Sequence, residues 1–229
     1  MGRKSAVIHC NPKLTHQVEL SSQLLDGLAR HDISASIRGS AAGDADIHVV
    51  MGPHFAYRQW QNHPNVLYID RAYWKDPECV SIHWLRNGEK HYARLGKYRW
   101  HPYTKPFKRG ERVLILEDYD KFPDVAIQAK QVTVRPHPSR KAPVNTLQED
   151  LDNHDIAIGC RTTALVDACI NGLKVITDDL YSPVKPISGS VNLVEREIWL
   201  QDLAWHNWSR SEIINGDFLD AIGRYNNAE

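Results

Sequence analysis

A short segment in the second half of the chain combines residue types that suit phosphate. Arg135-Pro136-His137-Pro138-Ser139 directly follows a strand-like apolar stretch. The two prolines restrict the backbone on either side of His137, because the pyrrolidine ring fixes φ. Arg135 offers a planar, forked donor that matches phosphate, and His137 offers a second donor. The segment predicts an anion site, and the alternative is a proline-rich turn with a hydrogen-bonded histidine.

A second segment with hydroxyl side chains lies 25 residues further along the chain. A strand is expected to end at Gly159, and a helix is expected to begin near Thr162. Hydroxyls and free backbone N–H groups at the start of a helix bind anions, although an ordinary threonine N-cap is the alternative. Both segments follow what look like neighbouring strands, so together they predict a phosphate-bearing ligand. The chain contains neither G-x-G-x-x-G nor G-x-x-x-x-G-K-[ST], the dinucleotide and P-loop signatures.

These two segments resemble a known family. An HP motif after one strand, followed by a hydroxyl pair that leads a helix of the form T-A-L-x-D-A-x-x-x-G-x-x-V-I-T, is similar to the donor half of GT-B glycosyltransferases. The similarity is greatest to bacterial sialyl-, polysialyl- and Kdo-transferase-type enzymes, and the overall pattern also resembles small phage-encoded glycosyltransferases. It covers about residues 112–180. The resemblance implies that His137, Thr162, Thr163 and Asp167 bind the nucleotide-sugar donor, with Arg135 as an added donor to its phosphate.

Two series of short strands and helices must position these residues. Strands are expected at 6–10, 33–37, 46–51 and 66–69, with a helix over about 17–30. After a predicted hairpin at 79–95, a second series places strands at 113–116, 132–134, 155–158 and 173–177. Helices are expected over 122–130, 144–153, 162–171, 195–207 and 210–224, and Ser209-x-x-Glu212 predicts a capping box at the start of the last one. The Pro- and Gly-bearing residues 96–111 separate the two series. The expected fold is α/β, with two small Rossmann-like halves, a β-hairpin insertion and C-terminal helices. The expected domains are 1–105 on the acceptor side and 106–229 on the donor side.

An inverting sugar transfer also needs a base for the acceptor hydroxyl. Three strand ends in the first half offer one, and the candidates are Asp70, His54 and His9. Each has a structural alternative: Asp70 could pair with Arg71, His54 could cap a helix, and His9 could be half-buried. The pair Asp178-Asp179 could bind a metal but is more often a solvated turn. No metal or other cofactor is expected besides the nucleotide-sugar as co-substrate.

Residues 86–112 carry a concentrated positive charge. They contain nine Lys or Arg against two Glu, a net +7 that the remaining chain balances with −7. Cations neutralise phosphates and aromatic rings stack on bases. The pattern predicts a nucleic-acid surface, and the alternatives are a solvated hairpin or a wall of the donor cleft. The candidate contacts are Arg94, Lys97, Arg99, Trp100 and Lys105.

The composition is that of an ordinary globular protein. Of 229 residues, 42% are apolar and 24% are charged, which excludes a disordered chain. No run approaches the ~20 apolar residues of a membrane span, and the N-terminus does not look like a secretory signal. The four cysteines have no C-x-x-C spacing, so reduced thiols and a cytoplasmic location are expected.

The favoured function is therefore a glycosyltransferase that moves a sugar from a nucleotide-sugar to a hydroxyl. The favoured acceptor is a hydroxymethylated pyrimidine in DNA, because of the +7 segment, which makes DNA a partner beside the nucleotide-sugar. The alternatives are a glycan or lipopolysaccharide-type transferase, and a non-catalytic nucleic-acid-binding protein.

Overall fold

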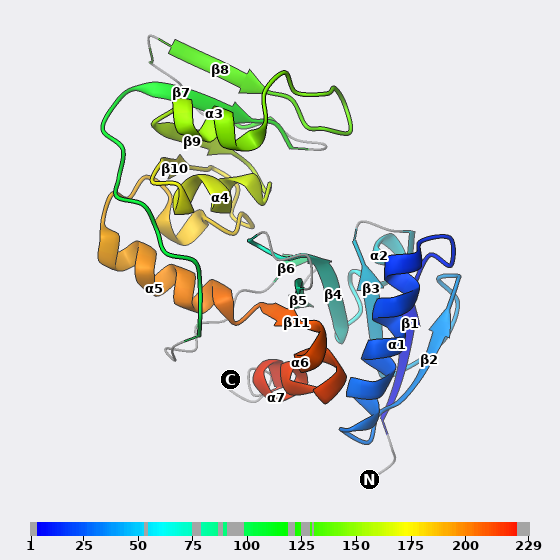
Figure 1. Cartoon of the computed structure of the whole chain (residues 1–229). Coiled ribbons are helices and arrows are strands. Elements are labelled where there is room, and N and C mark those ends of the chain that lie inside the picture. Colours follow the sequence, from blue (N-terminus) through cyan, green and yellow to red (C-terminus); the bar gives the residue numbers. More distant parts are fainter. Residues whose placement is uncertain are drawn as a thin grey trace. The chain divides into compact units, whose positions relative to one another are not determined.

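The chain divides into two compact units, each with its own sheet (Figure 1). The structure, a computed structural model, describes residues 4–52, 55–74, 79–86, 89–90, 99–118, 122–124, 129 and 131–223. Unit 1 comprises residues 1–95 and 205–229, and unit 2 comprises residues 96–204. Both units combine parallel strands with helices, so the predicted α/β class is confirmed.

Unit 1 contains seven strands and four helices among the residues described. The strands are β1 (Ser5–His9), β2 (Ser34–Arg38), β3 (Ile47–Met51), β4 (Val66–Arg71), β5 (Cys79–Arg86), β6 (Glu89–Lys90) and β11 (Asn207–Ser209). The helices are α1 (Thr15–Ala29), α2 (Phe55–Trp60), α6 (Arg210–Asn215) and α7 (Asp217–Gly223). The sheet order is β11-β5-β4-β3-β1-β2, with β6 paired to β5. Strands β2, β1, β3 and β4 are parallel, and β5 is antiparallel to β4.

The C-terminal residues belong to unit 1. The expected boundaries grouped them with residues 106–204, although the last helices were expected to cross back toward the first half. Strand β11 pairs with β5, and Trp208 and Phe218 are buried in the core beneath α1. Helices α1 and α6 approach so closely that a Cβ atom on Gly27 would lie 2.1 Å from the carbonyl oxygen of Ile213. Gly216, with φ +78°, separates α6 from α7 where one helix was predicted over 210–224. Buried apolar surface in these last elements places them with unit 1.

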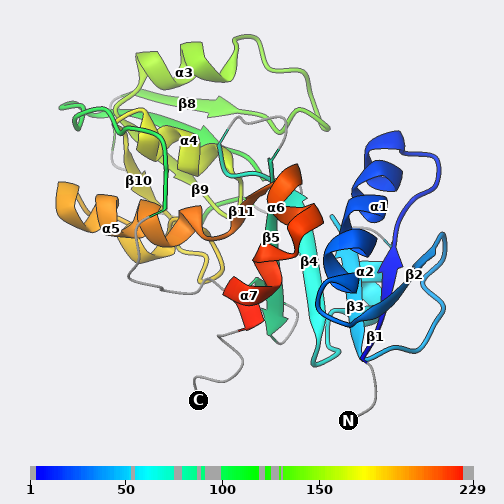
Figure 2. The same cartoon turned by 60° about the horizontal axis from the view of Figure 1, so that its bottom comes forward.

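Unit 2 contains a four-stranded parallel sheet with the order β10-β9-β7-β8 (Figure 2). Its strands are β7 (Arg112–Leu116), β8 (Gln131–Arg135), β9 (Ile156–Gly159) and β10 (Lys174–Ile176). Its helices are α3 (Leu147–Asn153), α4 (Ala164–Ile170), the 3-10 helix η1 (Lys185–Ile187) and α5 (Leu193–Ala204). Apart from residues 122–124 and 129, the helix predicted over 122–130 lies outside the described residues.

The segment predicted to be a linker is fastened to unit 2 over residues 105–108. The N–H groups of Lys105 and Lys108 donate to the carbonyls of Ile170 and Gly172, each at 2.8 Å. The buried guanidinium of Arg196 lies 3.5 Å from the centre of the Phe107 ring and donates to the carbonyl of Lys105. Gly172 has φ +86°, and a Cβ atom there would lie 2.3 Å from the carbonyl oxygen of Pro106. These contacts make residues 105–108 part of unit 2 rather than a free connection.

Two buried histidines are hydrogen-bonded across β1 and β3 of unit 1. His9 Nδ1 donates to the carbonyl of Ser40 at 2.9 Å, since a carbonyl can only accept. His9 Nε2 is then the acceptor for His48 Nδ1–H, at 3.1 Å. The His48 ring stacks on Trp60, with ring centres 3.6 Å apart. His48 Nε2 is buried with no hydrogen-bond partner among the residues described, so the ring is held in its neutral form.

This environment predicts a loss of stability in mild acid. The pKa of His48 is lowered from 6.5 to about 4, chiefly by burial and also by His63 and His9, while Asp44 acts in the opposite direction. The unfolded chain therefore binds a proton that the folded chain does not between about pH 6.5 and 4. The stabilising contribution is complete above that window and falls by up to about 3 kcal/mol across it. Urea unfolding of wild type and His48→Gln against pH should show a shallower acid slope in the variant. His16→Gln, on the exposed face of α1, is the matched control, and equal slopes in all three proteins would contradict the assignment.

Candidate functional site

The parallel sheet of unit 2 has one edge at which all four strands end. From β7 the chain continues to β8 on one side, and from β9 it continues to β10 on the other. The pair β7–β9 is therefore the topological switch point, where α/β sheets bind ligands beyond the carboxyl ends of the strands. Glu117 and Asp118 follow β7, and Cys160, Arg161 and Thr162 follow β9.

The predicted segments do not follow neighbouring strands, which corrects the sequence analysis. Strand β7 pairs with both β8 and β9 and lies between them. The chain passes from β8 through α3, which packs on β7, before it forms β9. The ends of β8 and β9 are thus two strand spacings apart, about 10 Å. His137 and the threonine pair can reach one anion only by extending across the end of β7.

His137 lies in a tight turn that orients its ring. Its carbonyl accepts from the N–H groups of Arg140 and Lys141, at 2.9 and 3.2 Å. The N–H of Ser139 donates to His137 Nδ1 at 3.3 Å, and Ser139 Oγ lies 2.7 Å from the same nitrogen. Because a backbone N–H can only donate, Nδ1 is an acceptor and the neutral ring carries its proton on Nε2. A neutral ring with this hydrogen bond can therefore donate through Nε2, as a contact with phosphate would require.

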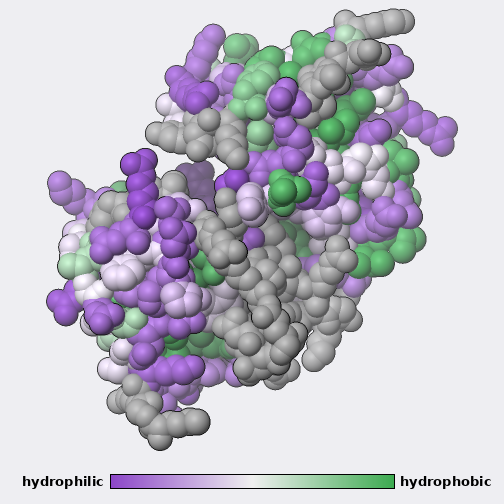
Figure 3. All heavy atoms as spheres, turned by 180° about the vertical axis from the view of Figure 1, so that it is seen from behind, coloured by the Kyte–Doolittle hydropathy of each residue, from purple (hydrophilic) through white to green (hydrophobic). Residues whose placement is uncertain are grey.

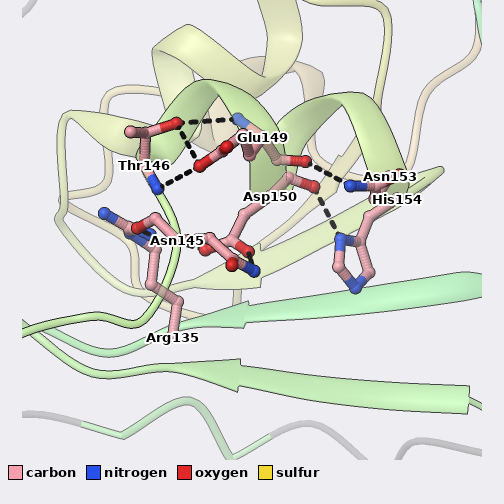
Figure 4. Close-up of polar contacts among 7 residues, drawn as sticks. All are labelled: Arg135, Asn145, Thr146, Glu149, Asp150, Asn153 and His154. Atoms are coloured by element: carbon pink, nitrogen blue, oxygen red, sulfur yellow. Dashed lines mark hydrogen bonds and ion pairs between the residues drawn. The ribbon is translucent and has the colours of Figure 1, made fainter.

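Arg135 is bound within the protein, whereas a contact with phosphate was predicted for it. Its guanidinium forms an ion pair with Asp150 of α3 and donates to the carbonyl of Asn145 at 2.9 Å (Figure 4). The two charged side chains are only 12% and 6% exposed. Asn145 also donates to Asp150, at 2.9 Å. These contacts join the two ends of the loop that carries His137, so Arg135 positions that loop.

We call the contacts of Arg135 with Asp150 and Asn145 the Arg135–Asp150 clamp. Helix α3, which carries Asp150, begins with a capping box that supports this clamp. Thr146 accepts from the N–H of Glu149, while the Glu149 carboxylate accepts from the N–H and hydroxyl of Thr146 (Figure 4). These hydrogen bonds lower the pKa of Glu149. His154 Nδ1 donates to the carbonyl of Asp150 at 2.6 Å at the other end of the helix. The helix that holds Asp150 is thus fixed at both ends.

The threonine pair lies at the end of β9 and is half-buried. Thr162 Oγ1 accepts from the N–H of Ala164 at 3.3 Å, whereas the side chain of Thr163 makes no capping hydrogen bond. Helix α4 begins at Ala164 and has seven residues, so it is shorter than predicted. Asp167 lies four residues after Thr163, on the same face of the helix.

An ion-pair network beside Thr162 was not predicted. The N–H of Arg161 donates to Asp118 Oδ2 at 2.8 Å, and Arg161 Nε donates to Asp179 Oδ2 at 2.9 Å. The Arg161 guanidinium also lies over the Tyr181 ring, 4.9 Å from its centre. Asp179 was considered as half of a metal pair or as a solvated turn, but its side chain is 6% exposed and paired with Arg161. Only the strand order could bring residues 118, 161 and 179 together, and the sequence does not state that order. Among the described residues, no group of three or more His, Cys, Asp or Glu is placed to hold a metal.

The candidate bases in unit 1 differ in their surroundings. Asp70 lies near the end of β4 with a side chain that is 30% exposed. Its carboxylate accepts from Lys90 Nζ at 2.9 Å, so its ion pair is with Lys90, whereas Arg71 donates only its N–H, at 2.8 Å. His9 is fully buried with both ring nitrogens hydrogen-bonded, which does not suit a base for an incoming hydroxyl. His54 lies outside the described residues.

Much of the charge in the basic segment is used within the protein. Lys90 binds Asp70, Lys105 pairs with Asp152 at 3.8 Å, and Lys108 Nζ donates to two carbonyls at the end of α3. The Arg112 guanidinium forms two hydrogen bonds with Asp155, and the Arg112 N–H forms a third. Trp100 is 64% exposed. Of the other candidate contacts, Arg99 lies within the described residues, whereas Arg94 and Lys97 lie outside them. The sequence-based net charge of +7 therefore overstates what this segment offers to a polyanion.

The surface carries several exposed apolar side chains, among them Val191, Leu193, Val194 and Ile198 near the start of α5. On the face in Figure 3, hydrophobic residues form separate patches among hydrophilic ones, which is usual for a protein surface. Within the described ranges, none of the helices combines the length and the apolar character needed to cross a bilayer. All four cysteines are free thiols.

Similarity to known proteins is found at the level of structure. No family model matches the chain, and no curated protein matches it. The structure is similar to that of Thermosulfurimonas dismutans KpsC, described as a beta Kdo 2,7 transferase. The two chains are 11% identical, with a TM-score of 0.49, and the alignment covers 97% of this chain and 99% of the other. Similarity at this level does not assign a function.

The clamp at the base of the His137 loop leads to a stability prediction. Asp150→Ala leaves the Arg135 guanidinium buried without its anion, which should cost about 3 kcal/mol of unfolding free energy. Asp152→Ala, on the same helix, removes an exposed pair with Lys105 and should cost at most about 1 kcal/mol. Chemical denaturation of the two variants measures both values. Equal and small losses would show that the clamp contributes little.

Proposed function

We propose that the protein is a glycosyltransferase of the GT-B type, which transfers a sugar from a nucleotide-sugar to a hydroxyl acceptor. The observation that carries the proposal is the set of groups at the carboxyl edge of unit 2. His137, in its Nε2–H tautomer, and the hydroxyls of Thr162 and Thr163 lie on either side of the end of β7. The same residues form the HP and T-A-L-x-D-A pattern of GT-B donor halves.

These groups suit a leaving nucleotide phosphate. As the bond between the sugar and the phosphate breaks, negative charge develops on the phosphate oxygens. Donors that are already oriented toward those oxygens stabilise the transition state more than the ground state. The turn at residues 137–141 fixes the ring of His137, and the Arg135–Asp150 clamp fixes the loop that carries the turn. The role of the protein is therefore orientation of donors, with the nucleotide-sugar supplying the leaving group.

Asp70 is the proposed base for an inverting transfer. A carboxylate with 30% exposure can be reached by a hydroxyl, and Lys90 holds it at a fixed position near the end of β4. An acceptor hydroxyl would have to share the carboxylate with Lys90. His54, which lies outside the described residues, remains the second candidate for this role.

Two classes of acceptor, DNA and a glycan, follow from the surface of the chain. Hydroxymethylated DNA was favoured by the basic segment, but Lys90, Lys105, Lys108 and Arg112 have partners within the chain. Trp100 and Tyr103 remain exposed and could stack on a base or on a sugar. DNA and a glycan are therefore both tested as acceptors, and DNA binding without transfer would favour a non-catalytic nucleic-acid-binding protein.

The donor site predicts a specific loss of nucleotide binding. His137→Ala removes the Nε2–H donor and should weaken the binding of a nucleoside diphosphate or CMP by about 1–3 kcal/mol. Isothermal titration calorimetry with UDP, GDP and CMP measures this and also identifies the nucleotide. His16→Ala on α1 is the control and should bind as wild type does. If wild type binds none of these nucleotides, the proposed function falls.

The proposed role of Asp70 as the base predicts that its removal lowers turnover but leaves nucleotide binding unchanged. Asp70→Asn should retain nucleotide affinity and reduce transfer by about 10²–10⁴, the usual contribution of a positioned base. Mass spectrometry should follow transfer from UDP- and CMP-sugars to hydroxymethylated DNA and to a glycan acceptor. Asp26→Asn, an exposed carboxylate of α1, is the control. Near-normal transfer by Asp70→Asn would move the role to His54.

A further inference from the structure

We propose that Arg161 is a positioning residue for the nucleotide site, and that it sets the Thr162–Thr163 pair through Asp118 and Asp179. The inference deepens the proposed function and rests on it. We call the three residues the Asp118–Arg161–Asp179 brace. The brace joins the loops that follow three adjacent strands, β7, β9 and β10, and therefore spans the switch point.

The brace fixes Arg161 at two separate points. Its backbone N–H is bound by Asp118 from the β7 loop at 2.8 Å, and its side-chain Nε is bound by Asp179 from the β10 loop at 2.9 Å. The backbone and the side chain of one residue are thus held from opposite sides. Because Thr162 is the next residue, its position is set by the same two carboxylates.

Asp179 is itself held in place. Its Oδ1 accepts from the N–H of Tyr181 at 2.9 Å, and its own N–H donates to Thr177 Oγ1 at 3.2 Å. Thr177 Oγ1 in turn lies 3.4 Å from the carbonyl of Cys160, the residue before Arg161. A closed set of contacts therefore surrounds the residues that lead to the threonine pair. The Asp179 carboxylate is nearly buried, so it depends on the Arg161 cation.

The same sheet provides a second ion pair with a purely structural position. Arg112 and Asp155 lie at the opposite edge, where β7 and β9 begin. They form hydrogen bonds of 2.9 Å through Nε and Nη2, and Arg112 lowers the pKa of Asp155. Asp155 and Asp179 both have side chains that are 6% exposed. Each pair thus joins a partly exposed arginine to a nearly buried aspartate through Nε, and of these two pairs only the Arg161–Asp179 pair adjoins the candidate nucleotide site.

The experiment compares Asp179→Asn with Asp155→Asn. Calorimetry should measure the affinity of each variant for the nucleotide that wild type binds, and thermal unfolding should measure the stability of each variant. Both variants should lose stability. Asp179→Asn should also weaken nucleotide binding by about 10- to 100-fold, since displacement of a binding group by about 1 Å has effects of this size. Asp155→Asn should bind within about twofold of wild type. In the transfer assay, Asp179→Asn should raise the KM for the donor and leave the KM for the acceptor unchanged.

Two further variants keep the test decisive if Asp179→Asn does not fold. Arg161→Lys retains the charge but loses the Nε–H that binds Asp179, and Asp118→Ala removes the acceptor for the Arg161 N–H. Each should weaken nucleotide binding in the same direction. Wild-type affinity in both variants, with wild type itself binding nucleotide, would overturn the role of the brace and leave the proposed function intact. Absence of nucleotide binding by wild type would instead overturn the proposed function.

Discussion

The pairing of β7 with both β8 and β9 determines which residues of unit 2 meet at the carboxyl edge of its sheet. Because all four strands are parallel, every strand ends at the same edge, and residues from distant parts of the chain meet there. The central position of β7 also separates His137 from Thr162 by a strand. Any ligand that both groups bind must lie across the end of β7. The distance that such a ligand must span is thus set by the order of the strands rather than by the sequence of the loops.

Ion pairs at the ends of strands hold this arrangement in place. The Arg135–Asp150 pair closes the loop after β8, the brace joins the loops after β7, β9 and β10, and Arg112–Asp155 fastens the opposite edge. In each pair the carboxylate is nearly buried, so loss of the arginine would leave an uncompensated charge. Arg196 is the exception, since it is buried against Phe107 and bonds two carbonyls. The loops at the strand ends of unit 2 are thus held by ion pairs, whereas residues 105–108 are held by packing and backbone hydrogen bonds.

Local sequence was sufficient to predict most of the elements but not their order. Apolar periodicity located the strands that became β1 to β5 and β7 to β10, and Ser209-x-x-Glu212 predicted the capping box of α6. The short strand β11 was missed because its three residues owe their conformation to pairing with β5, a contact across more than 120 positions. For the same reason Arg135 was interpreted as a ligand: its partner Asp150 is visible in the sequence, but their proximity depends on how α3 packs. The brace required three loops to be placed in space, which no local pattern provides.

The two units place their polar side chains differently around equivalent pairs of strands. In unit 1, β1 and β3 form the pair whose onward connections diverge, so they are the counterpart of β7 and β9. The buried His9–His48 pair and the half-buried Trp60 ring lie against these strands rather than beyond their carboxyl ends, because His48 is the second residue of β3 and lies opposite Val7 of β1. In unit 2, half-buried hydroxyls and a partly exposed arginine follow β9 at its carboxyl end. Groups beyond the ends of parallel strands can meet a ligand, whereas groups packed against the strands are enclosed by the protein. The proposed assignment of the nucleotide to unit 2 follows from this difference.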